Sequence, residues 1–263
     1  VKPLESPAPL LEVRGVTLQY KTKEHLVTAT YRVSFDVMQS ERFVLLGPSG
    51  CGKSTLMKAV GGYMTPTEGT MTLKGKQIRR PGPDRMMVFQ EFDQLLPWKT
   101  VKKNVIFALE SSGKMRGRAA AEKAMEAIAK VNLTKFADNY PHTLSGGMKQ
   151  RVAIARALAV DPQVALLDEP FAALDAQNRS LLQDELVRIA QATRKTMVLI
   201  THSIDEAIKL SDRIIVMTKR PGTVKANIVV DIPRPRAEDD ARVIALKKQL
   251  RALIADEREV ELA

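Results

Sequence analysis

The segment that most constrains the fold is Gly-Pro-Ser-Gly-Cys-Gly-Lys-Ser at residues 47–54. It follows a short apolar run at 42–46 and precedes a helical pattern at 53–60, which predicts a strand, a loop and a helix. Glycines let consecutive backbone N–H groups converge on a phosphate, toward which the following helix points its positive end. An ordinary glycine-rich turn is the alternative, but a chance match in such a chain has odds of about one in a hundred. We therefore expect a phosphate-binding loop in which Lys53 reaches the β- and γ-phosphates and Ser54 ligates Mg²⁺.

Three short apolar runs, at 42–46, 163–167 and 196–200, predict the centre of a sheet. Strands buried on both faces have this unbroken apolar character. Helical patterns at about 100–160 and 176–193 separate the runs. We expect an α/β fold with a mostly parallel central sheet covered by helices.

Further β structure is predicted on either side of the phosphate loop. Alternating apolar and polar residues at 11–20 and 30–37 are typical of half-buried strands. Residues 62–90 predict a second small β region with glycine and proline turns. The tail is expected to hold a proline-broken strand up to Arg236 and a final helix at about 238–257.

Polar side chains follow two of the apolar runs. Asp168 and Glu169 come directly after the run at 163–167, and His202 follows the run at 196–200. Open α/β sheets bind ligands at the carboxyl ends of their strands. An aspartate there suits coordination of Mg²⁺, and the adjacent glutamate could polarise an attacking water. The alternatives are a helix-capping pair for the two carboxylates and a structural or capping histidine.

A second helix start also has the composition of an anion site. Leu-Ser-Gly-Gly-Met at 144–148 opens the helical segment 149–158. Free N–H groups and a small hydroxyl at a helix N-terminus bind anions, although a bare Ser-Gly-Gly is more often an ordinary cap. Two such helix starts in one chain are not expected to serve the same nucleotide.

The net positive charge bears on whether the chain binds nucleic acid or an anionic membrane surface. The chain of 263 residues holds 41 Lys plus Arg against 30 Asp plus Glu, a formal net charge of +11. The basic residues are dispersed and aromatics are few, so stacking platforms for single-stranded nucleic acid are not expected. An anionic membrane surface or plain solubility is favoured over nucleic acid.

Other features of composition point to a protein on the cytoplasmic side. The single cysteine, Cys51, excludes an internal disulfide and fits a reducing compartment. No stretch approaches the roughly 18 consecutive apolar residues of a membrane span. Residues 1–10 lack the apolar centre of a signal peptide.

In combination and in order, these motifs resemble the nucleotide-binding subunit of an ATP-binding-cassette (ABC) transporter. The motifs are the phosphate loop, 144–148, Leu-Leu-Asp-Glu-Pro at 166–170 and Thr-His at 201–202. The resemblance covers about 10–236 and implies a P-loop NTPase fold with an antiparallel β subdomain and a helical signature-motif subdomain at about 91–160. Residues 1–9 are expected to be a flexible segment and 237–263 a helical tail.

The family pattern implies roles residue by residue. Catalysis is implied for Glu169 as base, His202 as switch, Gln90 and Lys53. ATP binding is implied for Tyr20, which matches the adenine-stacking aromatic, and for Gly47, Pro48, Ser49, Gly50, Cys51, Gly52, Lys53, Ser54 and Thr55. Contacts with ATP held by the opposite subunit are implied for Ser145, Gly146, Gly147 and Asp175. Ligation of Mg²⁺ is implied for Ser54, Gln90 and Asp168.

A narrower set of motifs is similar to the nitrate, sulfonate and taurine importers. It comprises residues 81–85, 88–90, 95–101 and 144–151 with the ending at 220–222 and 232–236. This implies an ATPase dimer of two identical copies, transmembrane permease subunits, an external solute-binding protein and a peripheral place on the cytoplasmic face of the membrane. Departures from the usual pattern occur at Ser40, Ala172 and Ser203, none of them a catalytic position.

The sequence also leaves two alternative functions to weigh, and one segment, residues 92–100, whose location is open. A cassette ATPase acting on nucleic acid or ribosomes is the alternative, motivated by the net charge, but no specific nucleic-acid partner is expected from one cassette without a long coiled coil. A non-enzymatic ATP-binding regulator is disfavoured because Glu169 and His202 are both present. Residues 92–100, with Leu96 and the sole tryptophan, Trp98, are expected either to receive a permease helix or to pack in the core. The solute cannot be read from these residues.

Overall fold

The computed structural model describes residues 8–21, 25–90, 94–172 and 174–259. The chain divides into two compact units: Val1–Pro81 with Leu199–Ala263, and Gly82–Val198. Strand β8 (Thr196–Thr201) crosses the boundary between them. Among the described helices, none combines the length and the apolar character needed to cross a membrane.

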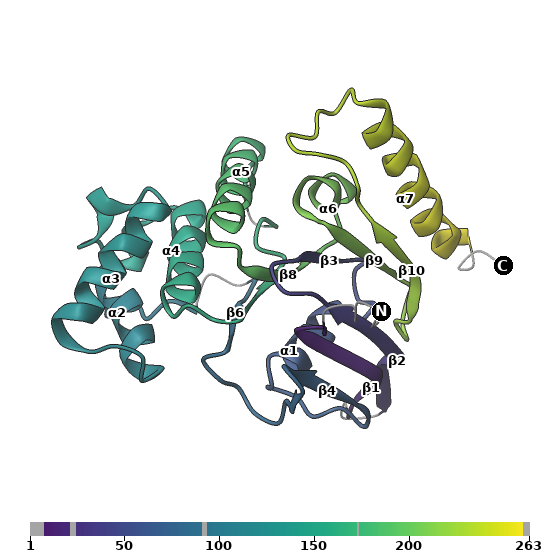
Figure 1. Ribbon diagram of the computed structural model, residues 1–263, viewed down its shortest axis with the longest axis horizontal. Coiled ribbons are helices and arrows are strands. Elements are labelled where there is room, and N and C mark those ends of the chain that lie inside the picture. Colours follow the sequence, from purple (N-terminus) through teal and green to yellow (C-terminus); the bar gives the residue numbers. More distant parts are fainter. Residues whose placement is uncertain (1–7, 22–24, 91–93, 173, 260–263) are drawn as a thin grey trace, which may run out of the picture. The chain divides into compact units, whose positions relative to one another are not determined.

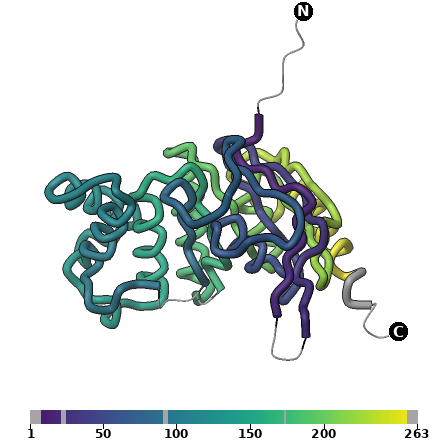
Figure 2. Tube along the Cα trace, turned by 90° about the horizontal axis from the view of Figure 1, so that it is seen from below, coloured from purple at the N-terminus to yellow at the C-terminus, as the bar shows by residue number. Residues whose placement is uncertain are grey.

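The first unit contains an antiparallel sheet with the strand order β2-β1-β4-β5 (Figure 1). Its strands are β1 (Leu11–Lys21), β2 (Leu26–Val37), β4 (Glu68–Leu73) and β5 (Lys76–Gln77). Figure 2 shows β1 and β2 running side by side over their whole length. The alternating residues of β1 bury Leu11 and Val13 on one face, so the period-2 pattern predicted this sheet correctly.

The first unit also holds the apolar strands beside the phosphate loop. Strand β3 (Arg42–Leu46) pairs in parallel with β9 (Arg213–Met217), and β9 pairs antiparallel with β10 (Val224–Val229). The helices of this unit are α1 (Lys53–Val60), α6 (Ile204–Leu210) and α7 (Ala241–Glu259). Helix α6 packs against β3, and α7 packs against α6 and β9.

The second unit is mainly helical. Helices α2 (Val101–Ser111), α3 (Gly117–Lys130) and α4 (Gly146–Ala159) pack on one another, and α4 also contacts β6 and α5. Short 3₁₀ turns lie at Thr134–Phe136 and Pro141–Thr143. Strand β6 (Arg85–Val88) pairs in parallel with β7 (Val164–Asp168), and α5 (Ala176–Thr193) follows. The predicted α/β fold class is confirmed.

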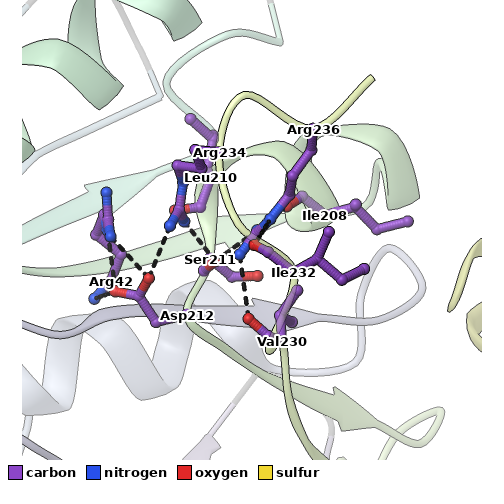
Figure 3. A network of polar contacts seen from close by, with 9 residues as sticks. All are labelled: Arg42, Ile208, Leu210, Ser211, Asp212, Val230, Ile232, Arg234 and Arg236. Carbon is purple, nitrogen blue, oxygen red and sulfur yellow. Dashed lines mark hydrogen bonds and ion pairs between the residues drawn. The ribbon is translucent and has the colours of Figure 1, made fainter. Parts of the chain in front are cut away.

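The tail departs from its prediction. The expected strand up to Arg236 ends at Val229. Pro233 and Pro235 further along have no N–H with which to resume a ladder. Instead, Arg234 and Arg236 donate hydrogen bonds to backbone carbonyls at the end of α6 (Figure 3). Carbonyls at a helix C-terminus have no partner within the helix, so the two guanidinium groups cap α6.

Asp212 links this cap to β3. Its carboxylate accepts from Arg42 Nε at 2.9 Å and Nη2 at 2.8 Å, and from Arg234 Nη1 at 3.0 Å (Figure 3). Burial raises the pKa of Asp212, but hydrogen bonds and charge from Arg42 and Arg234 outweigh burial, so the net pKa lies below its ordinary value. The charged carboxylate therefore stabilises the fold.

We expect Asp212→Asn to lower the free energy of unfolding by about 2 kcal/mol, because it leaves two half-buried guanidinium groups without their anion. A group whose folded pKa is depressed contributes stability above its unfolded pKa of about 4 and loses it as the pH falls through the folded pKa. The stability difference between wild type and Asp212→Asn should therefore shrink on acidification. Urea unfolding at several pH values measures both effects.

The control for this experiment is Glu122→Gln. Glu122 pairs with Arg118 one helical turn away, and both side chains are exposed. Such surface pairs contribute little to stability. Equal stability losses for the two variants would contradict the role given to Asp212.

Candidate functional site

The phosphate loop, residues 47–54, curls around the amine of Lys53. Lys53 Nζ donates to the carbonyl oxygens of Gly47 and Pro48, both at 2.8 Å, and lies 3.8 Å from Cys51 Sγ. The Lys53 residue is only 4% exposed. A buried ammonium requires such partners, and here it holds the two ends of the loop together.

The start of α1 fits a phosphate. Gly52 precedes the helix with φ 99°, no side chain caps the first turn, and that turn contains no acidic residue. The helix N-terminus therefore keeps its positive end without a negative side chain against it. Cys51 faces inward, and burial raises the pKa of its thiol despite the opposing effect of Lys53.

Tyr20 and His202 belong to the same unit as the phosphate loop. Tyr20 lies near the end of β1 and is 37% exposed, so part of its ring is open for stacking. His202 is exposed directly after β8, and the cap of the following helix α6 is its neighbour Ser203, whose Oγ accepts from Glu206 N at 3.3 Å. The capping alternative for His202 is therefore wrong.

In the second unit, Asp168 and Glu169 lie at the carboxyl end of β7. Asp168 is the last residue of the strand and is 4% exposed. Glu169 has φ 43°, a left-handed conformation that costs a non-glycine residue about 1 kcal/mol or more. The following helix, α5, is capped by Asp175, so neither carboxylate caps it. The oxygen donors of Asp168 and, in the first unit, Ser54 are of the type that Mg²⁺ prefers.

Ser145 caps α4, as an ordinary Ser-Gly-Gly helix start does. Its Oγ accepts from Met148 N at 3.3 Å, and Gly146 and Gly147 form the first turn, which contains no acidic residue. Asp175 likewise accepts from Asn178 N at 2.9 Å, and this hydrogen bond holds the pKa of Asp175 below its ordinary value. Capping leaves other N–H groups of the α4 turn open to a ligand, as the resemblance implies.

Gln90 follows β6 and is exposed. Residues 91–93 lie outside the described residues, but Gln94 fixes the backbone before them. Its side chain donates to Phe89 O at 2.9 Å and accepts from Phe89 N at 3.2 Å, while Arg156 donates to Gln94 O at 2.5 Å. Gln94 was not predicted from the sequence, because an isolated glutamine in a loop carries no pattern.

The turn after Gln94 presents Trp98 outward. Asn104 is fully buried; its side chain accepts from Leu96 N at 2.8 Å and donates to Lys99 O at 2.9 Å. Leu95 packs inside, but Trp98 is 70% exposed. The core-packing alternative is therefore wrong for Trp98. Asn104 was not predicted either; its only signal was a polar residue on the face of α2 that carries Val101 and Val105.

The predicted site residues thus fall into two groups. The first unit holds Tyr20, residues 47–55 and His202; the second holds Gln90, Ser145, Gly146, Gly147, Asp168, Glu169 and Asp175. Within each unit, the local backbone is ordered by caps, ladders and side-chain clamps.

Comparison with known proteins points to one family. The family model described as "ABC transporter" matches residues 30–172. The chain is 46% identical to the bicarbonate transport ATP-binding protein CmpD of Synechococcus elongatus, over 90% of this chain and 84% of that protein. It is 45% identical to the taurine import ATP-binding protein TauB of Rhizobium johnstonii, over 87% of this chain and 89% of that protein.

A longer relative and a solved structure point to the same family. The chain spans only 31% of the longer bicarbonate transport ATP-binding protein CmpC of a Synechocystis species. The structure is similar to an ATP-binding cassette solved as a dimer in a post-hydrolysis state with ADP and phosphate. The TM-score is 0.75 at 32% identity, covering 85% of this chain and all of that one. The family model over residues 30–172 and the identity to these relatives over most of both chains show that the chain belongs to the ABC transporter family.

Proposed function

We propose that this chain is the ATP-hydrolysing subunit of an importer for a small oxygen-rich anion or zwitterion. The observation that carries the proposal is similarity over most of both chains to ATP-binding subunits named for bicarbonate transport and taurine import. The phosphate loop built around Lys53 and the carboxylates after β7 supply groups that such an ATPase needs.

The proposed reaction divides among the named residues. Backbone N–H groups of the phosphate loop and the Lys53 ammonium bind the β- and γ-phosphates. Ser54, Gln90 and Asp168 hold Mg²⁺, which when bound neutralises charge on the phosphates. Glu169 orients and polarises the attacking water, and His202 contacts the γ-phosphate.

A second copy completes the site in this proposal. Ser145, Gly146, Gly147 and Asp175 contact ATP that the opposite subunit holds. The similarity to a cassette dimer bound to ADP and phosphate supports this assembly. The two copies close head to tail around two ATP molecules, and hydrolysis reopens them.

In this proposal ATP hydrolysis drives conformational changes in membrane proteins that bind the ATPase dimer. We place the dimer on the cytoplasmic face, bound to transmembrane permease subunits that receive solute from an external binding protein. Trp98 and the partly exposed Leu96 supply an apolar surface for a short permease helix.

The first test is Glu169→Gln in the complex with permease subunits. Removing the carboxylate should lower the ATPase turnover by about 100-fold or more, because an amide cannot accept a proton. ATP binding should persist, and phosphate release measures the turnover. Unchanged turnover would contradict the role of Glu169, and Glu122→Gln is the matched surface control.

The second test is Trp98→Asp or Leu96→Asp. A charge in the proposed docking surface should abolish solute uptake by vesicles holding the complex while leaving the basal ATPase of the isolated subunit unchanged. The control is Tyr63→Asp, a similar change at an aromatic residue that is 51% exposed in the first unit. Wild-type uptake by both docking-surface variants would refute the docking role.

The solute is tested by uptake of labelled bicarbonate, nitrate, a sulfonate and taurine, each with ATP inside the vesicles. We expect uptake of one of these solutes by the wild-type complex and none by Glu169→Gln. Failure of all four in a complex that still hydrolyses ATP would refute the proposed solute class.

A further inference from the structure

Strand β9 ends in a closed turn at residues 218–223. Thr218 N donates to Thr223 O at 3.0 Å, and Thr223 N donates to the Thr218 hydroxyl at 2.9 Å. The two threonine hydroxyls lie 3.0 Å apart. A backbone hydrogen bond and the Thr218 hydroxyl thus close the turn together.

The turn is also attached to β2. Gly222 N donates to Ala29 O at 2.9 Å, and Tyr31 N donates to Gly222 O at 3.0 Å. These two hydrogen bonds form a short parallel bridge between Gly222 and Thr30. The turn therefore sits at a fixed place beside the strand, through backbone atoms alone.

The phosphate loop packs against both elements without room for another carbon. A Cβ on Gly222 would lie 2.1 Å from Cys51 O, and a Cβ on Gly52 would lie 2.5 Å from Ala29 O. Real Cβ contacts are not shorter than 3.0 Å, so each added carbon requires a backbone shift. Gly222 is not among the residues with positive φ, so it is glycine here because of space.

The contact at Cys51 bears on the N–H groups of the loop. The Cys51 carbonyl and the Gly52 N–H belong to one planar peptide unit. Pushing that carbonyl aside by roughly 1 Å therefore turns the Gly52 N–H as well. Displacements of this size in a catalytic site can cost about 100-fold in rate.

We propose that the 218–223 turn is a positioning element for ATP binding: Gly222 supports the Cys51 carbonyl and thereby aims the backbone N–H groups of the phosphate loop at the nucleotide phosphates. The proposal rests on the phosphate-binding role of residues 47–54. It assigns a role to a segment that contains no side chain of the proposed reaction.

The first experiment compares wild type with Gly222→Ala. Its KM for ATP in the complex should rise about tenfold or more, the effect of losing a hydrogen bond to a charged phosphate. The sole cysteine supplies an independent measurement, because Cys51 is 1% exposed and should react slowly with a thiol reagent. Displacing the loop should accelerate that reaction without nucleotide present.

Gly75→Ala is the matched control. Gly75 lies in the turn between β4 and β5, and a Cβ there meets nothing within 4 Å, although its φ of 73° strains an alanine. This variant shows how much an alanine in a turn changes stability and ATP binding when it does not touch the phosphate loop. Melting temperatures of both variants without nucleotide measure their loss of stability. If Gly222→Ala and Gly75→Ala lose similar stability but only Gly222→Ala has a raised KM for ATP, the effect on ATP binding is specific to Gly222.

A second pair of variants tests the turn without adding an atom beside the loop. Thr218→Val removes the hydroxyl that helps to close the turn and should raise the KM for ATP and the Cys51 labelling rate. Thr218→Ser retains the hydroxyl and should restore both toward wild type. If Gly222→Ala fails to fold, these two variants still test whether the 218–223 turn positions the phosphate loop.

The outcomes distinguish failure of the positioning role from failure of the proposed function. Wild-type KM and wild-type Cys51 labelling in Gly222→Ala and Thr218→Val would overturn the positioning role. Failure of the wild type itself to bind ATP would refute the proposed function instead. A larger KM with faster labelling in Gly222→Ala and Thr218→Val, but not in Gly75→Ala or Thr218→Ser, is the expected result.

Discussion

The buried ammonium of Lys53 holds the phosphate loop closed from within, through the carbonyls of Gly47 and Pro48. These hydrogen bonds compensate for removing the charge from water, and they bring the beginning of the loop back to the start of α1. The surrounding chain then packs against this closed backbone: β9 beside Gly47, β2 beside Gly52 and the 218–223 turn beside Cys51. Backbone N–H groups bind a phosphate best when they are aimed in advance, so in the proposed function this backbone packing is part of the site.

The groups that the family pattern implies are distributed over two compact units. The first supplies the phosphate loop and His202; the second supplies the carboxylates after β7 and the start of α4. Local devices order each group: Ser203 caps α6, Ser145 caps α4, and Gln94 clamps Phe89. The contacts that order each of these groups thus lie within its own unit.

Local patterns predicted much of this structure. The strand–loop–helix around residues 47–54 and helix α5 are found where the sequence placed them, because apolar periodicity and caps are local signals. The roles of Asn104 and Gly222 were not predicted, because Asn104 orders an irregular turn that has no repeating pattern and Gly222 packs against the Cys51 carbonyl, a segment distant in sequence. The tail prediction was wrong for a related reason: Arg234 and Arg236 act on carbonyls more than twenty residues earlier.

The arginine cap on α6 shows that the folded cassette extends beyond its last strand. A shortened chain that stopped after β10 would contain every predicted site residue, yet it would leave the last carbonyls of α6 to water and Asp212 with one arginine fewer. That helix begins two residues after His202. Anyone who trims such a protein for crystallisation, fusion or expression should therefore keep residues 230–236 instead of stopping at the final strand.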